Sequence, residues 1–411
     1  MNLKTTFISI LILCTFSTYA QNKAFEDFTN LHDSLMHKAY KERNPKNYLL
    51  SLNKFNEEYN KLSDRDKDYF KGNRITAFYN LSCTYSLLND KKNAIIYLKK
   101  SIEVGYNDFD HIQQDTDLDN IRKEKDFLKL IQAYREINDY LYILKKAGKY
   151  NLTEKQEIPL FTYQNADNPN LITLRKTFNL DSIAGSASEV SKILNLMHWV
   201  HNLIPHDGLN LNPVVKNALS MIRECRTDAR GLNCRGLATV LNECYLSMGI
   251  KSRIVTCLPK DSLGNDNDCH VINMAYSTEF KKWLWIDPQN NAYVMNDQGE
   301  MLNIEEVRER LINDKPFILI PEANVNNKIP VVKSNYIYNY MAKNLYMLEC
   351  PISSEFDSET KEAGKTNRYL RLKPLEYFKK SLEKEVLEGN ETKNARVFYL
   401  TNNPNTFWQT P

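Results

Sequence analysis

Gly231-Leu232-Asn233-Cys234-Arg235-Gly236-Leu237-Ala238 is the stretch that decides the fold of this 411-residue chain. Apolar residues recur at three- and four-residue steps from Leu237 to Met248, and Gly249 follows them, which predicts a helix that ends there. The residues just before Cys234 are typical of a loop, so we expect this cysteine in the first helical turn. Unpaired N–H groups and the positive end of the helix dipole favour a thiolate at that position.

Three β-rich runs follow this helix. They are 251–258, 270–276 and 282–286, and a polar loop separates the first two. A turn centred between Thr278 and Glu279 would place His270 directly opposite Asp287, with Cβ atoms about 5 Å apart. A bulge or a different register would break this pairing.

Cys234, His270 and Asp287 can therefore supply a nucleophile, a base and a residue that orients the base. Each also has a simple structural explanation. A cysteine in an amphipathic helix is commonly a core residue, a single histidine is commonly structural, and an aspartate before proline is a usual turn residue. Their order and spacing together favour a catalytic Cys-His-Asp site. An inactive, decayed version of that site is the alternative.

The same positions resemble the transglutaminase-like superfamily, whose core is related to papain-like thiol enzymes. The resemblance covers roughly residues 190 to 315. It rests on a preceding helix at 193–200, on the Cys234 segment, on His270, and on Trp283 followed by Asp287-Pro288. It implies an α+β fold in which the nucleophile helix packs on an antiparallel sheet.

The chain departs from the pattern of that superfamily at two places. Ile272 stands where many members carry an aromatic residue, and the residues beside Cys234 lack a frequent acidic neighbour. Both departures leave the substrate class open. The β-sandwich and barrel domains and the calcium sites of the large animal cross-linking enzymes have no counterpart in the sequence.

An oxyanion hole is expected to use the backbone N–H of Cys234 as one donor. The resemblance implies a second donor upstream of the nucleophile. Trp199, His201, His206 and Asn233 are the candidates in range, and the two histidines are preferred because they are polar and lie near the end of the preceding helix.

Eight cysteines occur in the chain, and Cys14 lies in the expected signal segment. The remaining odd number leaves at least one thiol unpaired, as a nucleophile requires. Cys257 and Cys269 flank the polar loop, and whether they form a disulfide stays open. Metal-ligand spacing is absent from the sequence, and we expect neither a metal nor a cofactor.

The first residues predict export. A short basic start is followed by an apolar run at 7–16 and by Thr18-Tyr19-Ala20, which resembles a signal-peptidase site. We therefore expect a signal peptide at 1–20 and a periplasmic or extracellular protein. No other apolar run is long enough for a membrane span. A net charge of +3 is near balance and does not favour nucleic-acid binding.

Residues 21–150 predict a helical region. Part of it is similar to one tetratricopeptide repeat, with large and small residues at repeat positions from Phe78 to Ser101 and a turn at Asn89-Asp90. One repeat cannot form a solenoid alone, so helices around 25–39 and 47–62 are expected to complete it. This region is either a cap or a peptide-binding surface.

The remaining chain divides into a catalytic domain at 151–325 and an extension at 326–411. Strands are predicted at 368–373 and 396–401 around a helix at 374–388, which suggests a small C-terminal α+β addition. The aromatic residues near the end, Phe407 and Trp408, predict that the tail docks.

Two classes of function are compatible with these patterns. The first is an exported thiol enzyme that acts on amide bonds of a peptide or protein through an acyl-enzyme. Hydrolysis is preferred to acyl transfer because no feature marks a dedicated amine site. The second is an exported interaction protein that binds a partner through the helical region and keeps the core as a scaffold.

Overall fold

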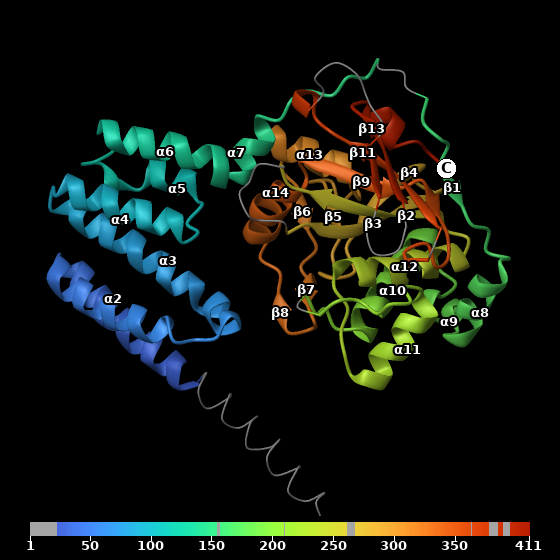
Figure 1. Ribbon diagram of the computed structural model, residues 1–411, viewed down its shortest axis with the longest axis horizontal. Helices are drawn as coiled ribbons and strands as arrows, with labels where there is room; N and C mark the ends of the chain where they lie inside the picture. Colours follow the sequence, from blue (N-terminus) through green and yellow to red (C-terminus); the bar gives the residue numbers. More distant parts are fainter. Residues whose placement is uncertain are drawn as a thin grey trace, which may run out of the picture. The chain divides into compact units, whose positions relative to one another are not determined.

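A computed structural model describes residues 23–411 except 154–156, 209, 261–267, 363, 378–384 and 389–394. The predicted signal peptide lies outside the described residues. The chain divides into two compact units, with unit 1 ending at Asp139 and unit 2 beginning at Tyr140 (Figure 1). This division falls before residue 150, where the sequence placed a domain boundary, because α7 (Tyr140–Lys145) belongs to unit 2.

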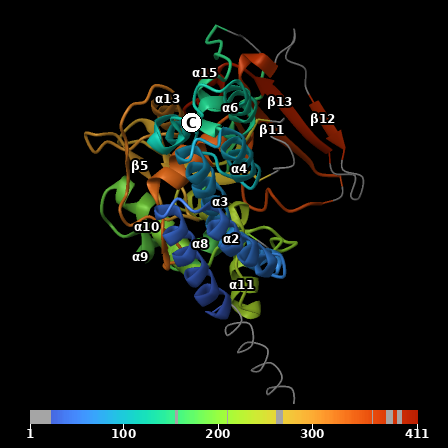
Figure 2. The same ribbon diagram turned by 90° about the vertical axis from the view of Figure 1, so that its left-hand side faces the viewer.

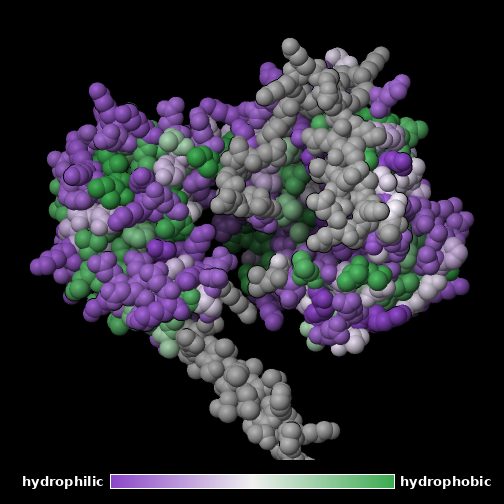
Figure 3. Space-filling view, viewed as in Figure 1, coloured by the Kyte–Doolittle hydropathy of each residue, from purple (hydrophilic) through white to green (hydrophobic). Residues whose placement is uncertain are grey.

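Unit 1 consists of helices joined by short turns, with no strand among its described residues. A helix at 23–41 precedes α2 (Pro45–Tyr59), α3 (Asp64–Leu87), α4 (Lys91–Glu103), α5 (Phe109–Gln114), the short 3-10 helix η1 (Thr116–Leu118) and α6 (Lys125–Asn138). The turn between α3 and α4 follows the sequence prediction, because Asn89 has a φ of 60° and the Asp90 side chain caps α4. Ala94 and Leu98 of α4 are fully buried against α3. The visible surface of this unit is mostly hydrophilic with small hydrophobic patches (Figure 3).

Unit 2 is built on a seven-stranded sheet with the order β12-β13-β11-β9-β2-β3-β4. Only the β11–β13 pair is parallel among these strands. Their bounds are β2 Ser252–Leu258, β3 His270–Ser277, β4 Lys282–Ile286, β9 Met347–Pro351, β11 Thr366–Leu372, β12 Glu385–Glu388 and β13 Ala395–Thr401. The short strands β1 (Thr162–Tyr163) and β10 (Ser353–Ser354), β5 (Val294–Met295) and β6 (Ile318–Leu319), and β7 (Asn324–Val325) and β8 (Ile329–Pro330) form three separate pairs.

Helices cover both faces of this sheet (Figure 1). One face packs on α10 (Glu189–Leu203) and α12 (Cys234–Ser247). The helices α8 (Pro169–Thr177) and α11 (Ala218–Asp228) pack on α12, and α9 (Leu180–Ala184) packs on α10. The other face packs on α7, α13 (Ile304–Ile312), the π-helical segment η2 (Ser334–Met341) and α14 (Ala342–Asn344). The chain therefore has the predicted α+β fold, with α12, the helix that begins at Cys234, packed on antiparallel strands.

The C-terminal strands join the same sheet as β2, β3 and β4. Tyr369, Phe398 and Leu400 form a small apolar cluster on these strands. Figure 2 shows β11, β13 and β12 together at one edge. The helix predicted at 374–388 was wrong where the structure describes it, because Leu375–Tyr377 is a 3-10 turn (η3) and β12 is a strand that pairs with β13.

The chain's end docks as predicted. The short helix α15 (Pro404–Phe407) buries Phe407 completely. Arg253 of β2 is itself buried, and its guanidinium donates to the carbonyl oxygens of Phe407 at 2.9 Å and Gln409 at 2.8 Å. The aromatic ring of Phe161 lies 3.5 Å from the same guanidinium carbon. Arg253 thus ties the tail and the segment before α8 to the sheet.

Candidate active site

The thiol of Cys234 lies at the first residue of α12. Asn233 caps this helix, with an extended backbone and a side-chain oxygen that accepts a 3.2 Å hydrogen bond from the N–H of Gly236. Cys234 is partly exposed and packs against Val271 and Ile254 of the sheet. The predicted position of the nucleophile at a helix start therefore has a clear local cause, which is the asparagine cap.

Two glycines allow the chain to pack closely around this helix start. A Cβ on Gly236 would lie 2.6 Å from Oδ1 of Asn212, and Asn212 donates to Oδ1 of Asn233 at 2.7 Å. A Cβ on Gly231 would lie 2.4 Å from the carbonyl oxygen of Pro205. Side chains at these positions would displace the loops that border Cys234. The contribution of Asn212 has no signal in the local sequence pattern.

His270 and Asp287 form the buried part of the site. Nε2 of His270 lies 2.7 Å from Oδ2 of Asp287, and neither side chain is exposed. The predicted contact exists, but the predicted register was wrong by two residues. Asn273 pairs with Ile286 and Ser277 pairs with Lys282, so Asp287 lies beyond the end of the ladder and diagonal to His270.

The cause of this difference is the turn. Four residues, 278–281, connect β3 to β4, and Lys281 adopts a left-handed backbone with φ of 53°. The carboxylate of Glu189, at the start of α10, accepts hydrogen bonds from the hydroxyls of Ser277 and Thr278. A shift of two residues keeps a side chain on the same face of a sheet, so His270 still reaches Asp287.

Asp287 receives further donors that the sequence did not reveal. The backbone N–H and side-chain amide of Asn290 donate to it at 3.1 and 2.9 Å, and the hydroxyl of Tyr336 donates at 2.5 Å. Asn290 belongs to the turn that follows Asp287, a pattern that a search for Asx turns would find. Tyr336 comes from η2, so no local pattern could indicate it. Tyr340 of the same segment lies edge-on to the His270 ring, 5.3 Å between centroids.

Electrostatic interactions among Asp287, His270 and Cys234 favour the charged form of each side chain. Burial alone would raise the pKa of Asp287, but the charge and hydrogen bond of His270 keep that pKa below its ordinary value. Burial alone would lower the pKa of His270, and Asp287 and Cys234 together raise it instead. The pKa of Cys234 is lowered although burial opposes this, because His270, the N–H of Val271 and Arg235 favour the thiolate. A thiolate beside an imidazolium is the expected state of this arrangement.

The remaining ring nitrogen, Nδ1 of His270, is buried and has no hydrogen bond of ordinary geometry to any described residue. Cys234 is nevertheless close enough to raise the pKa of His270 by charge and hydrogen bonding. The thiol therefore lies near the His270 ring without a hydrogen bond of ordinary geometry to it. Such contacts commonly tighten only when substrate is bound.

The two histidines proposed for the oxyanion hole have different surroundings. Nδ1 and Nε2 of His201 each lie 3.0 Å from an oxygen, of Pro288 and Asn324 respectively, so this buried ring holds the turn after Asp287. His206 is half-buried, and its backbone N–H and carbonyl bond the side-chain amide of Asn326. Burial and the charge of His270 lower the pKa of His206. Of the two histidines, His206 is therefore the better candidate for the second oxyanion donor. The oxyanion role of both histidines stays a prediction.

Every cysteine among the described residues is a free thiol, including Cys257 and Cys269. Cys257 pairs with His270 across the β2–β3 ladder and is completely buried. Burial raises the pKa of Cys257 well above its ordinary value, and burial likewise raises the pKa of Cys269. Cys234 is thus the thiol of this cluster whose pKa is shifted toward reactivity. Across the described ranges no group of three or more potential ligands could hold a metal ion.

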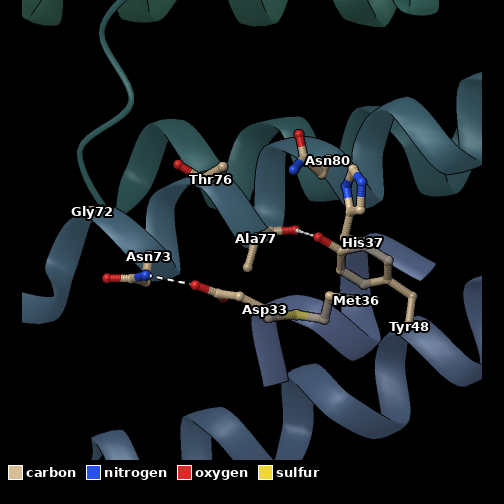
Figure 4. A pocket seen from close by; sticks show the side chains of 9 residues that line it. All are labelled: Asp33, Met36, His37, Tyr48, Gly72, Asn73, Thr76, Ala77 and Asn80. Carbon is tan, nitrogen blue, oxygen red and sulfur yellow. Dashed lines mark hydrogen bonds between the residues drawn. The ribbon is translucent and has the colours of Figure 1, made fainter. Parts of the chain in front are cut away.

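A separate cavity of about 410 Å³ lies in unit 1 (Figure 4). The helix at 23–41 contributes Asp33, Met36 and His37, and α2 contributes Tyr48. One face of α3 provides the rest of the lining, which is Gly72, Asn73, Thr76, Ala77 and Asn80. Asn73 donates to Asp33 at 2.8 Å, and Tyr48 donates to the carbonyl oxygen of Ala77 at 3.0 Å. The lining of the cavity mixes polar and apolar groups, and it includes none of Cys234, His270 and Asp287.

Comparisons with known proteins agree with this geometry. Residues 176–288 match the family model described as the transglutaminase-like superfamily, and this range contains Cys234, His270 and Asp287. The chain therefore carries a transglutaminase-like domain.

Two further similarities are short. The chain is 40% identical over 60 residues to a chloroplastic protein of Arabidopsis thaliana, a match that covers 15% of this chain and 18% of that protein. A solved structure titled as "a Putative Cysteine Protease from Cytophaga hutchinsonii" matches 31% of this chain and 45% of its own, with 18% identity and a TM-score of 0.23. The chain thus covers less than half the length of either protein, and a TM-score of this size carries no argument about the fold.

Proposed function

We propose that this protein is an exported thiol enzyme that acts on amide bonds of a peptide or protein. Cys234 is the nucleophile, His270 the general base and acid, and Asp287 the residue that orients His270. One observation carries the proposal: a fully buried His270–Asp287 pair lies beside a partly exposed thiol whose pKa is lowered. The transglutaminase-like match over the same residues supports it.

In the proposed reaction the Cys234 thiolate attacks the amide carbonyl carbon and forms a C–S bond. The electron pair of the carbonyl moves to its oxygen, and the backbone N–H of Cys234 donates to that oxyanion, with His206 as the proposed second donor. His270 gives its proton to the leaving nitrogen as the C–N bond breaks. A thioester and a free amine result.

The second half of the reaction resolves the thioester. His270 removes a proton from water, and the hydroxide attacks the thioester carbonyl to give a carboxylic acid and the Cys234 thiol. Asp287 stays ionised throughout and holds the ring of His270 by its Nε2–H. Because no feature of the described residues marks a dedicated site for an acceptor amine, we propose hydrolysis rather than acyl transfer.

A thiol-directed probe tests the assignment of the nucleophile. Iodoacetamide should alkylate Cys234 faster than the other thiols under native conditions, and Cys234→Ala should abolish this labelling while the circular dichroism spectrum stays unchanged. Cys225→Ala is a matched control, because burial raises the pKa of that thiol to about 11. Equal labelling after Cys234→Ala would assign the reactive thiol to another cysteine and end the proposal.

An interaction role for unit 1 is the second candidate. The cavity between the helix at 23–41 and α3 is the observation that favours it, because its mixed lining offers apolar contacts together with amide and carboxylate groups that can bond a peptide. Export places either activity in the periplasm or outside the cell. Among the described residues no helix has the length and hydropathy needed to cross a membrane.

A further inference from the structure

The cavity of unit 1 combines a buried apolar side with an opening to solvent. Met36, Tyr48 and Ala77 are buried and supply the apolar side. Gly72 and Thr76 are exposed, and a Cβ built on Gly72 would meet no atom within 4 Å, so the lining is open there. A flexible side chain of a ligand can therefore enter this cavity of about 410 Å³.

One carboxylate lines the cavity, and no lysine or arginine does. Asp33 is half-buried, and the side-chain amide of Asn73 donates to its Oδ2 at 2.8 Å (Figure 4). Burial raises the pKa of Asp33, whereas Asn73 and His32 lower it. Burial also lowers the pKa of His32, so this ring is a weak counter-charge at neutral pH. Among the described residues Asp33 makes no ion pair with a lysine or arginine, and a cation on a ligand could pair with it.

The polar groups around Asp33 use their donors inside the protein. A carboxylate only accepts, so Asn73 must turn its NH₂ toward Asp33, and Oδ1 of Asn73 stays available as an acceptor. The hydroxyl of Tyr48 donates to the carbonyl oxygen of Ala77 at 3.0 Å. Burial raises the pKa of Tyr48, and a hydrogen bond from Asn80 opposes this rise, which means that Asn80 donates to the phenol oxygen. Acceptors therefore remain for a ligand, and an ammonium group carries three donors and no acceptor.

We propose that this cavity binds the ammonium group of a lysine side chain from a peptide partner, with Asp33 as the counter-ion. The ammonium donates to Oδ1 of Asp33, and the methylene stem packs on Met36 and Ala77, as lysine stems do on apolar surfaces. The proposal goes beyond the thiol enzyme and deepens the interaction role of unit 1, since it names the chemistry that the cavity recognises.

Lysine fits this cavity better than other sources of positive charge. A guanidinium pairs best through parallel bonds to both oxygens of a carboxylate, and Oδ2 of Asp33 already accepts from Asn73. An ammonium acts as a point charge and needs only one oxygen. A free peptide N-terminus carries the same charge but has no stem to cover the apolar side of the cavity.

Fluorescence anisotropy with defined peptides tests the site. The probe is a polyalanine peptide with one central lysine, blocked ends and a neutral fluorophore, and its match carries Nε-acetyl-lysine. The protein is the full chain with Cys234→Ala, so a hydrolase cannot consume the peptide and the result does not depend on a reactive thiol. We expect the lysine peptide to bind at least about fivefold more tightly than its match, the effect of one ion pair about 4 Å apart at a dielectric constant near 80.

Variants of unit 1 identify the groups responsible. Asp33→Asn keeps the size of the side chain but removes its charge, and it should reduce the preference for lysine to about one. Asp27→Asn is the matched control from the same helix, because its exposed carboxylate pairs with Lys23 outside the cavity, and it should keep the preference. Thr76→Trp places a large ring at the exposed edge of the lining and should weaken binding of the lysine peptide. Circular dichroism checks that each variant is folded.

The results separate this proposal from its rivals. Equal binding of the two peptides, or binding of neither, would overturn the lysine site, and so would a lysine preference that survives Asp33→Asn. Tighter binding of an arginine peptide, or of a lysine-free peptide with a free N-terminus, would replace lysine by that source of charge. Failure of Cys234 to react with alkylating reagents would end the proposed enzyme function and leave these binding results unchanged.

Discussion

His270 and Asp287 share a 2.7 Å hydrogen bond although their backbones are not opposite in the sheet. The four-residue turn between β3 and β4 shifts the ladder by two residues relative to a turn centred at 278 and 279. The histidine spans the diagonal, and Asn290 and Tyr336 hold the carboxylate where the ring can reach it. The pair therefore depends on a network and not on strand pairing alone.

Replacing Asp287 by Asn should leave the fold intact and lower turnover by about ten-thousandfold, as the equivalent change does in a serine protease. The amide cannot accept the Nε2–H of His270 and the donors of Asn290 in the same way, so the ring loses its fixed tautomer. Turnover of the best peptide substrate checks this, with the thermal unfolding midpoint measured in parallel. Near-normal turnover would remove Asp287 from the mechanism.

Tyr336→Phe should lower turnover by about tenfold, because it removes one hydrogen bond to a buried carboxylate that is worth about 1.4 kcal/mol. The effect should fall on kcat and leave KM nearly unchanged, since Tyr336 contacts Asp287 and not the substrate side of Cys234. Tyr338→Phe is a matched control from the same segment, and its ring is 38% exposed. Equal losses in both variants would point to damage of η2 and not to positioning of Asp287.

The sequence predicted the parts of this site that follow from local rules. The loop-type residues before Cys234 and the apolar period after it placed this cysteine at a helix start, and β-rich runs placed His270 and Asp287 on neighbouring strands. The register depended on the turn length, which Lys281 changes by adopting a left-handed backbone. The role of Tyr336 could not be predicted from the sequence, because its contact with Asp287 joins residues far apart in the chain. The strands of the C-terminal extension were predicted, but periodicity could not reveal that they join the same sheet.

The pH dependence of alkylation should report the pairing of Cys234 with His270. The pKa of Cys234 is lowered, so thiolate accumulates as pH rises through a value below the ordinary 9.0 of a thiol. His270→Ala removes the partner that favours the thiolate and leaves burial, which raises the pKa of Cys234. The inflection in the rate of iodoacetamide alkylation should therefore move to higher pH in this variant. An unchanged inflection would show that the thiol and the ring do not interact.

Gly231→Ala should destabilise the protein by roughly 1–3 kcal/mol, the usual effect of overpacking. The new Cβ would meet the carbonyl oxygen of Pro205 at 2.4 Å and Cβ of Asp207 at 2.8 Å, which flank His206. If His206 helps to hold the oxyanion, turnover should fall further than stability alone explains. Gly72→Ala is the stability control, since its Cβ would meet nothing within 4 Å and a helical alanine is favoured by about 1 kcal/mol. Denaturant unfolding measures the stability of both variants. A Gly231→Ala protein as stable as the wild type would show that the segment 205–207 can move to accommodate the new Cβ.

Glu243 makes stability depend on pH through a different mechanism. This buried residue of α12 accepts the backbone N–H groups of Ala218 at 2.7 Å and Asp357 at 2.9 Å, and burial raises its pKa to about 8 from an ordinary 4.5. Between these two pKa values the unfolded chain has lost the proton that the folded protein keeps, so unfolding releases a proton. The free energy of unfolding should then fall as pH rises from 4.5 to 8, with a slope of at most about 1.4 kcal/mol per pH unit. Glu243→Gln keeps one of the two acceptor oxygens and cannot ionise. It should lower the stability at every pH and remove this slope, whereas Glu279→Gln, an exposed control, should keep the slope. Urea unfolding at pH 5, 6, 7 and 8 gives the free energy of unfolding as a function of pH for each protein. If this free energy changes with pH equally in the wild-type and Glu243→Gln proteins, Glu243 has the same pKa in the folded and unfolded chains.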